Sequence, residues 1–237
     1  MDGWRQSIRR RVKIWIWLIG ILCAAISVVP PDPGKAQTRA PIFEQVEDID
    51  LPSLPGAHEP TLAGHNGAIY MSWLEHADDQ TKVMMAIMSD QAWSEPRIVH
   101  QSSDLFVNWA DFPGIAVFRD GTIAVHWLRG IGLSSFDYHV EIAVSHDGGV
   151  SWSEPLIPHE DRSFTQHGFV SMLPRGPDNM AIIWLDGRAY AAQRDAAKVP
   201  DAMQLRANTM TRDGALGRDV AIDMQTCSCG QTSLAAA

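Results

Sequence analysis

The residues of this sequence that could do chemistry occur in short polar segments next to aromatic residues. In these segments His, Asn, Asp and Arg stand where the neighbouring strands carry apolar residues, and such side chains bind ligands through hydrogen bonds and charge. Taken alone, each is explained equally well as an ordinary solvated loop residue. As a set they favour a binding or active site. The candidates are His58, Asn108, Trp109, Asp111, His126, His167, Asp186 and Arg188.

A metal site is the weaker alternative for these residues. Cys227 and Cys229 could join His58 or His167 as ligands. A structural zinc site usually takes two pairs of ligands, and two sulfurs with one residue between them provide only one pair. The same close spacing disfavours a disulfide between the two cysteines. We therefore expect no metal, no cofactor and no disulfide framework.

The elements that would position these residues are β-strands, and one hairpin identifies them best. Residues 138–144 alternate as a strand does, and residues 153–157 continue as the next strand. Between them, Asp147 and two following glycines have the composition of a tight turn, because glycine tolerates positive φ. Asp147 and Ser145 can bond backbone N–H groups across the turn, and Trp152 can pack against it. The residues that we expect to be structural are Ser145, Asp147, Gly149 and Trp152.

An internal repeat extends this strand pattern along the chain. Three segments align without gaps on Trp73, Trp127 and Trp184, at intervals of 54 and 57 residues. A second marker, Trp-Ser-Glu-Pro, begins at Trp93 and again at Trp152, 59 residues later. A period of this length with several short strands per unit is typical of a β-propeller, whose blades each pack only against their neighbours. The repeated tryptophans are expected to pack between blades.

The repeat divides the chain into blades of four antiparallel strands. The expected segments are an extended lead-in at 38–57, blades near 58–105, 106–163 and 164–226, and the start of another blade at 227–237. Three blades and the start of a fourth cannot close a ring, so the sequence predicts a fragment of a longer propeller. In a propeller the links between blades lie on the face opposite the hairpin described above, and the candidate residues lie in or beside those links.

The Ser-x-Asp-x-Gly-x-x-Trp spacing of the hairpin resembles the Asp-box, or bacterial neuraminidase repeat, of sialidase-like β-propellers. Further segments are similar to bacterial exported proteins of the exo-α-sialidase type. These segments are 106–113, His126-Trp127, 166–171, 184–188 and 227–232. The resemblance extends from about His58 to the end of the chain. It implies an all-β, six-bladed sialidase-like propeller, of which this chain holds about three blades and the start of a fourth.

The resemblance also implies roles for the candidate residues. Sialidases bind the sialic acid carboxylate with arginines, and they use an Asp as general acid/base and a Tyr nucleophile assisted by Glu. Here Asp111 would be the acid/base, and Arg188 would bind the carboxylate through two parallel hydrogen bonds. The other candidates would line the substrate site. The sequence departs from the family at the Arg-Ile-Pro signature, which reads His58-Glu59-Pro60, and no convincing Tyr–Glu pair is found.

The N-terminus has the features of a signal peptide. A basic segment from Arg5 to Lys13 precedes an uncharged apolar run, 14–29, and a small-residue cleavage site before Gln37. The run is shorter than the roughly 20 residues of a spanning helix. We therefore expect residues 1–37 to be removed and the protein to be exported to the periplasm or the medium, with membrane attachment only through an uncleaved segment. The remaining chain has 13 Lys and Arg against 26 Asp and Glu, which argues against nucleic-acid binding.

The sequence supports two functions. The first is an exported sialidase-like glycoside hydrolase that acts on terminal acidic sugars of glycans and is inactive as a fragment. The second is a non-catalytic Asp-box propeller that binds a carbohydrate or a protein, similar to the propellers of sortilin-like receptors and photosystem assembly factors. In both, the partner is a glycan or another small ligand at the rim that the links between blades form.

Overall fold

The computed structural model describes residues 46–132, 134–191, 203–228 and 230–236. The chain divides into two compact units, Met1–Ile49 and Asp50–Ala237, and all the strands belong to the second. The expected signal peptide and part of the expected lead-in lie outside the described residues. Among the residues that are described, no helix has the length and apolar character needed to cross a membrane.

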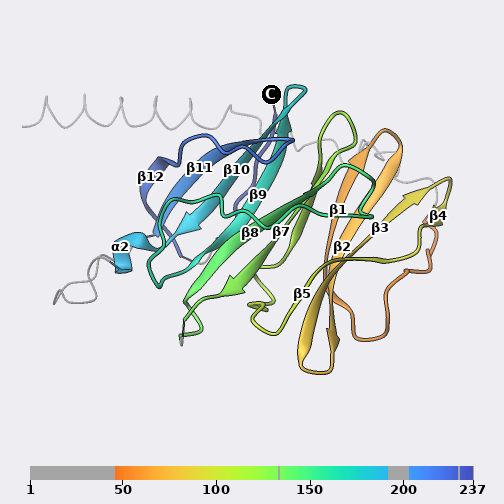
Figure 1. Ribbon diagram of the computed structural model, residues 1–237, viewed down its shortest axis with the longest axis horizontal. Helices are drawn as coiled ribbons and strands as arrows, with labels where there is room; N and C mark the ends of the chain where they lie inside the picture. The colour runs from red at the N-terminus through yellow and green to blue at the C-terminus, as the bar shows by residue number, and fades with distance from the viewer. Residues whose placement is uncertain (1–45, 133, 192–202, 229, 237) are drawn as a thin grey trace, which may run out of the picture. The chain divides into compact units, whose positions relative to one another are not determined.

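The first sheet is an antiparallel meander with a broken outer strand. Its strands are β1 (His58–His65), β2 (Ala68–Ala77), β3 (Gln80–Ser89), β4 (Ala92–Trp93) and β5 (Arg97–Ser102) (Figure 1). β1 pairs with β2 and β2 with β3, whereas β4 and β5 both pair with β3. The interruption falls at Pro96, which lacks the N–H that a continuous ladder requires.

The second sheet is a three-stranded meander. Its strands are β6 (Gly114–Val117), β7 (Ile123–Gly130) and β8 (Tyr138–Ser145), and β8 is buried along its whole length. The expected next strand, 153–157, is reduced to one bridge in which Ile142 and Leu156 exchange two backbone hydrogen bonds of 2.9 Å. Pro155 and Pro158 flank this bridge and cannot donate to a ladder, which explains why the strand does not extend.

The third sheet has four antiparallel strands in chain order. They are β9 (His167–Arg175), β10 (Asn179–Asp186), β11 (Met203–Thr211) and β12 (Val220–Thr226), and the short helix α2 (Arg188–Ala191) follows β10. Residues 230–236 form no strand. Thr232 nevertheless lies against β9, since its carbonyl and hydroxyl oxygens are each 2.8 Å from the hydroxyl of Ser171.

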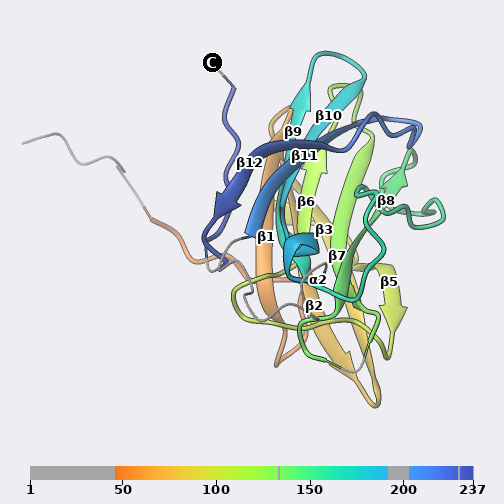
Figure 2. The same ribbon diagram turned by 90° about the vertical axis from the view of Figure 1, so that its left-hand side faces the viewer.

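The three sheets lie side by side with their first strands next to one another. β1 packs beside β6 and β6 beside β9, as Figure 2 shows near the centre of the view. One buried apolar cluster around Trp127 joins the first and second sheets, and another around Trp184 joins the second and third. The all-β class is confirmed, and its antiparallel sheets follow one another as propeller blades do. The number of blades in a closed propeller stays a prediction.

The three repeated tryptophans are core residues, as the repeat predicts. Each has at most 1% of its surface exposed. A buried indole N–H needs an acceptor, and each of the three donates to a buried carboxylate. The acceptors are Glu75 for Trp73 (2.7 Å), Glu141 for Trp127 (3.1 Å) and Asp186 for Trp184 (2.9 Å). In the first and third sheets the acceptor lies two residues after the tryptophan, whereas in the second sheet that position is Arg129 and the acceptor comes from β8.

The Asp-box hairpin, Ser145–Trp152, satisfies most of its polar groups internally. The carboxylate of Asp147 accepts hydrogen bonds from the Ser145 hydroxyl at 2.8 Å and from the Ser151 N–H at 2.9 Å. The Ser145 hydroxyl accepts one from the Gly149 N–H at 2.8 Å. These bonds, above all that from the Ser151 hydroxyl, hold the pKa of Asp147 well below its usual value. All of these contacts lie within the turn.

Candidate functional site

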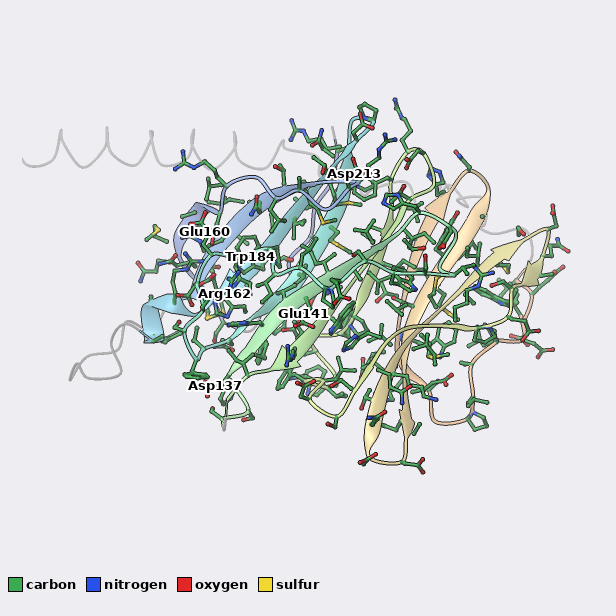
Figure 3. The ribbon with its side chains drawn as sticks, in the orientation of Figure 1. Asp137, Glu141, Glu160, Arg162, Trp184 and Asp213 are labelled. Atoms are coloured by element: carbon green, nitrogen blue, oxygen red, sulfur yellow. The ribbon has the colours of Figure 1, made fainter. Side chains whose placement is uncertain are left out.

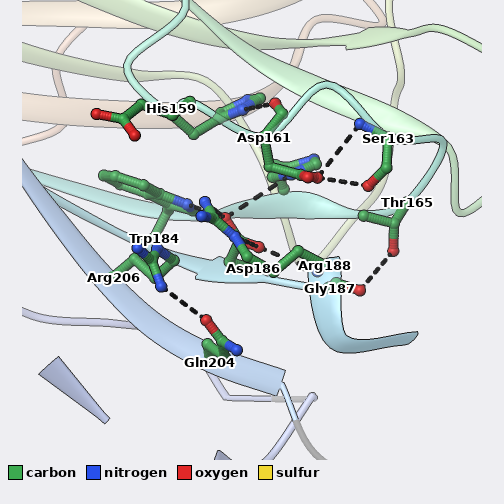
Figure 4. Close-up of polar contacts among 12 residues, drawn as sticks. His159, Asp161, Ser163, Thr165, Trp184, Asp186, Gly187, Arg188, Gln204 and Arg206 are labelled. Carbon is green, nitrogen blue, oxygen red and sulfur yellow. Dashed lines mark hydrogen bonds and ion pairs between the residues drawn. The ribbon is translucent and has the colours of Figure 1, made fainter. Parts of the chain in front are cut away.

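Three of the predicted site residues meet at one end of the third sheet. His167 begins β9, Asp186 ends β10 opposite it, and Arg188 follows two residues later. The guanidinium of Arg188 donates to both oxygens of the Asp186 carboxylate at 2.7 Å. His167 Nε2 is 3.7 Å from the same carboxylate. The structure therefore brings these three side chains together, and Figure 4 shows Asp186 and Arg188 among their neighbours.

Arg188 is held between two buried carboxylates. Its Nη2 is 2.7 Å from Asp186 and 2.7 Å from Asp219, and neither acidic side chain is exposed. Arg206 donates to the other oxygen of Asp219 at 2.5 Å. Burial lowers the pKa of Arg188, but the hydrogen bonds to Asp186 and Asp219 raise it by more. The charge of Arg188 is thus compensated inside the protein.

Two histidines that the sequence does not single out complete this region. His139 lies on β8 and His159 in the segment between β8 and β9, and they are 6% and 1% exposed. Burial is the main cause that lowers the pKa of His139 to about 4 and that of His159 still further. Figure 3 places Glu160 and Arg162 with Trp184 at this part of the third sheet, far from Asp213 at its other end.

Asp161 connects the histidines to the link segment. Its carboxylate is 3.0 Å from His167 Nε2 and accepts hydrogen bonds from the N–H and hydroxyl of Ser163, at 3.3 and 2.5 Å. Its backbone carbonyl is 2.7 Å from His159 Nδ1. The contacts of Asp161 with His159 and Ser163 are visible in Figure 4. The hydrogen bond with His167 is the largest cause that holds the pKa of Asp161 below its usual value.

Asp111, the predicted acid/base, lies buried between the second and third sheets. Only 2% of its surface is exposed, and it accepts a hydrogen bond of 2.7 Å from the Phe169 N–H. Its second oxygen is buried without a hydrogen-bond partner and fills the space that a side chain at Gly168 would need. Burial raises the pKa of Asp111 to about 7, although Phe169 and the nearby Tyr138 hydroxyl act in the opposite direction.

Large aromatic side chains are exposed in the segments around this region. Trp109 is 84% exposed, Phe136 63% and Phe164 56%. The loops of the two phenylalanines are neighbours. Tyr138 pairs in parallel with Gln166 and donates its N–H to the carbonyl of Thr165. Trp109 lies two residues before Asp111, and the Asn108 side chain accepts the N–H of the residue after Trp109 at 2.9 Å. Solvent therefore reaches three aromatic rings, on the loops before β6, between β7 and β8, and between β8 and β9.

The other two candidates lie apart from this region. His126 is 3% exposed and lines a pocket of about 250 Å³ between the first strands of the sheets, near Thr61 and Ser171. Burial lowers the pKa of His126 to about 3, and its Nδ1 has no hydrogen-bond partner. His58 begins β1 and lies 4.9 Å from the ring of His76. The eight candidates thus do not form a single site.

The sequence analysis missed His139, His159 and Asp161 for a simple reason. They belong to no repeat position and to no spacing that a metal or catalytic motif would have. Only the pairing of the chain around Tyr138 and Gln166 brings them beside His167. A useful signal would have been that β8, β9 and the link between them together hold four histidines.

No protein-family model matches the chain, and no curated protein matches it. Among solved structures, a Hadza microbial sialidase aligns with 65% of this chain at 17% identity and a TM-score of 0.39. A protein of unknown function from Dyadobacter fermentans aligns with 72% of the chain at 15% identity and a TM-score of 0.44. The catalytic domain of a GH62 α-L-arabinofuranosidase from Coprinopsis cinerea aligns with 76% at 8% identity and a TM-score of 0.41.

The chain is similar to only part of each of these structures. The aligned region covers 35% of the sialidase, 61% of the Dyadobacter protein and 54% of the arabinofuranosidase domain.

Proposed function

We propose that this chain binds a carbohydrate on three loops, which precede β6, join β7 to β8 and join β8 to β9. The observation that carries the proposal is the exposure of Trp109, Phe136 and Phe164 next to a buried polar region. Aromatic side chains are enriched at binding surfaces, because they combine a large apolar face with a small loss of conformational freedom. A sugar suits such a surface because its C–H face can stack on an aromatic ring while its hydroxyls bond to polar groups at the edge.

The charge of this surface favours an acidic sugar bound at Arg162. The side chain of Arg188 is compensated by two buried carboxylates. Arg162 is exposed, and its guanidinium donates to the backbone carbonyls of His159 and Asp161, the latter at 2.9 Å. Backbone carbonyls position a guanidinium without cancelling its charge, so Arg162 keeps a free positive charge for a carboxylate.

Calorimetric titration of the full chain with 3′-sialyllactose and with lactose tests this proposal. We expect the sialylated sugar to bind, lactose to bind more weakly, and Trp109→Ala to weaken binding at least about 10-fold. Val150→Ala is the matched control, because Val150 is 70% exposed on the Asp-box hairpin at the other end of β8. Equal binding by wild type and Trp109→Ala, or binding by neither, would reject the proposal.

Hydrolysis of terminal acidic sugars is the second candidate, and the pKa of Asp111 supports it. A general acid must hold its proton near neutral pH, and burial raises the pKa of Asp111 to about 7. Since Asp111 is 2% exposed, its loop would have to open for a substrate to reach the carboxyl group. This loop carries the exposed Trp109 two residues earlier.

Release of a chromogenic phenol from an aryl sialoside separates the two candidates. If the chain is a hydrolase, Asp111→Asn will lower turnover at least about 100-fold, and Asp147→Asn on the Asp-box hairpin will leave it unchanged. Glycan binding without any turnover by the wild-type chain would reject hydrolysis and leave the binding proposal standing.

A further inference from the structure

Three buried histidines form one cluster where the second and third sheets meet. In this histidine cluster the rings of His159 and His167 are stacked, with centroids 3.9 Å apart. The ring of His139 lies edge-on to both, at 4.7 and 5.1 Å. One ring nitrogen of each residue lies within 4.8 Å of those of the other two, and none of the three residues is more than 6% exposed. Such a concentration of imidazoles in the interior needs a physical reason.

The hydrogen bonds fix which nitrogens carry protons. His159 Nδ1 is 2.7 Å from the carbonyl of Asp161, and His167 Nδ1 is 3.2 Å from the carbonyl of Tyr138. A carbonyl only accepts, so both Nδ1 atoms are donors, and in a neutral imidazole Nε2 then has a bare lone pair. The ring of His139 also makes a hydrogen bond with the backbone of Ser163.

Two of the three Nε2 atoms lack the partners that buried acceptors normally have. Nε2 of His139 and Nε2 of His159 are both buried without any hydrogen-bond partner. Nε2 of His167 faces the carboxylate of Asp161 at 3.0 Å, a contact between two acceptors unless a proton or a cation lies between them. Leaving such groups unsatisfied costs about 1–3 kcal/mol each, so a missing partner explains the arrangement better than packing does.

We propose that His139, His159 and His167 bind a divalent transition-metal ion such as Zn²⁺ through their Nε2 atoms, with a water molecule as the fourth ligand. Imidazole nitrogens and carboxylate oxygens are the common ligands of Zn²⁺, at about 2.0–2.2 Å. Carbonyls that accept from Nδ1–H are the usual outer partners of such ligands, because they fix the ring orientation.

Binding requires a small movement of one ring. The ion must lie in the plane of each imidazole, whereas the planes of His159 and His167 are now parallel to within 6°. One of these rings must therefore tilt as the ion enters. The ligands come from β8, from the link after it and from β9, so the bound ion would tie the second sheet to the third. We assign it a structural role, and it shares only His167 with the weaker metal alternative of the sequence, in which Cys227 and Cys229 join His58 or His167.

Metal analysis of the untagged full chain tests the assignment. After treatment with a chelator and dialysis against excess Zn²⁺, wild type should retain one ion per chain. His159→Gln and His139→Gln should weaken binding at least about 100-fold. His100→Gln is the control, because His100 stacks on Trp127 at 4.5 Å outside the cluster. This variant should retain the ion.

Co²⁺ substitution gives a second measurement that needs no variant. A tetrahedral site should produce intense visible absorption, and X-ray absorption of the zinc form should show three imidazole nitrogens and one oxygen. Absence of a stoichiometric ion from wild type, or a zinc shell with fewer than three imidazoles, would overturn the proposal even if the histidine variants fail to fold. Equal retention by wild type and a folded His159→Gln would overturn it as well.

Discussion

The polar groups near the two ends of β8 differ in how many have a hydrogen-bond partner. At the Ser145 end, the Asp-box hairpin pairs its carboxylate and its hydroxyl groups within eight residues, and only the indole N–H of Trp152 is buried without a partner. At the Tyr138 end, the strand enters a region where buried groups have no partner. These groups are Nε2 of His139, Nε2 of His159 and Oδ2 of Asp111. The strand between them is buried along its length, so the two regions share a scaffold and differ only in how their polar atoms are satisfied.

This difference separates a motif that identifies a fold from a region that can act on a ligand. Asp147 and Asp111 are the same residue type, yet hydrogen bonds lower the pKa of Asp147 whereas burial raises that of Asp111 to about 7. The carboxylate of Asp147 and the hydroxyls of Ser145 and Ser151 are already bonded to one another within the turn. Buried groups that stay unsatisfied are rare in folded proteins, and they persist where a function or a bound ion compensates for them.

The largest expected effect comes from breaking the carboxylate network on the Tyr138 side. Asp186→Ala removes the acceptor of the buried Trp184 indole and one of the two buried carboxylates that hold Arg188, whose side chain is 22% exposed. Removing one partner of a buried ion pair lowers the free energy of unfolding by about 3–5 kcal/mol, because the remaining charge is left uncompensated. Chemical denaturation should show this loss of the free energy of unfolding as a lower midpoint.

Asp213→Ala is the matched control for that prediction. Asp213 is 77% exposed and 3.9 Å from its partner Arg212, and an exposed pair of this kind contributes little to stability. A loss of less than about 1 kcal/mol in Asp186→Ala would show that Asp219 alone compensates Arg188. The contrast between the two ends of β8 would then be weaker than the hydrogen bonds suggest.

The next effect concerns pH and the buried carboxyl group of Asp111. Its folded pKa of about 7 exceeds the unfolded value of 3.8, so its contribution to stability is fully present below pH 4 and is lost as the pH rises to 7. Asp111→Asn removes this titration. The stability of the variant relative to wild type should therefore increase between pH 4 and pH 8, by an amount approaching about 4 kcal/mol.

Urea denaturation of both proteins at pH 4, 6 and 8 measures this difference, because titration of all other groups cancels between them. Asp147→Asn provides the opposite case. The folded pKa of Asp147 is lowered, so wild type gains from this carboxylate above the unfolded pKa and loses the gain as the pH falls. A constant difference between Asp111→Asn and wild type would mean that solvent reaches Asp111 in solution.

The sequence predicts the scaffold better than the site, and particular residues show why. The alternation of residues 138–144 and the recurrence of Trp73, Trp127 and Trp184 are local signals, and each corresponds to a buried strand. The strand expected at 153–157 is wrong because two prolines remove its donors. The prediction followed the local pattern around these residues and did not include the loss of the proline donors.

The site depends on contacts that no local pattern contains. Asp186 and Arg188 were selected as neighbours in the sequence, but the second carboxylate on Arg188 comes from Asp219, 31 residues later. The histidine cluster draws on two strands and the link between them, and its members are 20 and 8 residues apart. These sequence separations match no helix or strand period, so the cluster becomes visible only when the strand pairing is known.

The smallest expected effect is a difference in stability between alanine variants of two turn glycines at the Asp-box end of the second sheet. Gly149 has a φ of +87°, and a side chain there would run into the sulfur of the buried Met85. Gly121 has a similar φ of +94° but open space around it. Both alanine variants carry the cost of a left-handed backbone, about 1–2 kcal/mol, and Gly149→Ala adds about 1 kcal/mol or more of overpacking. Thermal or urea unfolding should therefore rank Gly149→Ala below Gly121→Ala.

Neither glycine variant should change ligand or metal binding, because both turns lie at the end of the sheet opposite the histidine cluster. The comparison thus separates stability from function within one sheet. Gly149→Ala should lower the unfolding midpoint while the folded protein binds sialyllactose and Zn²⁺ as wild type does. If Gly149→Ala weakens either affinity at a temperature where the chain is folded, the hairpin and the cluster are coupled through β8. The division between an architectural end and a functional end would then be incorrect.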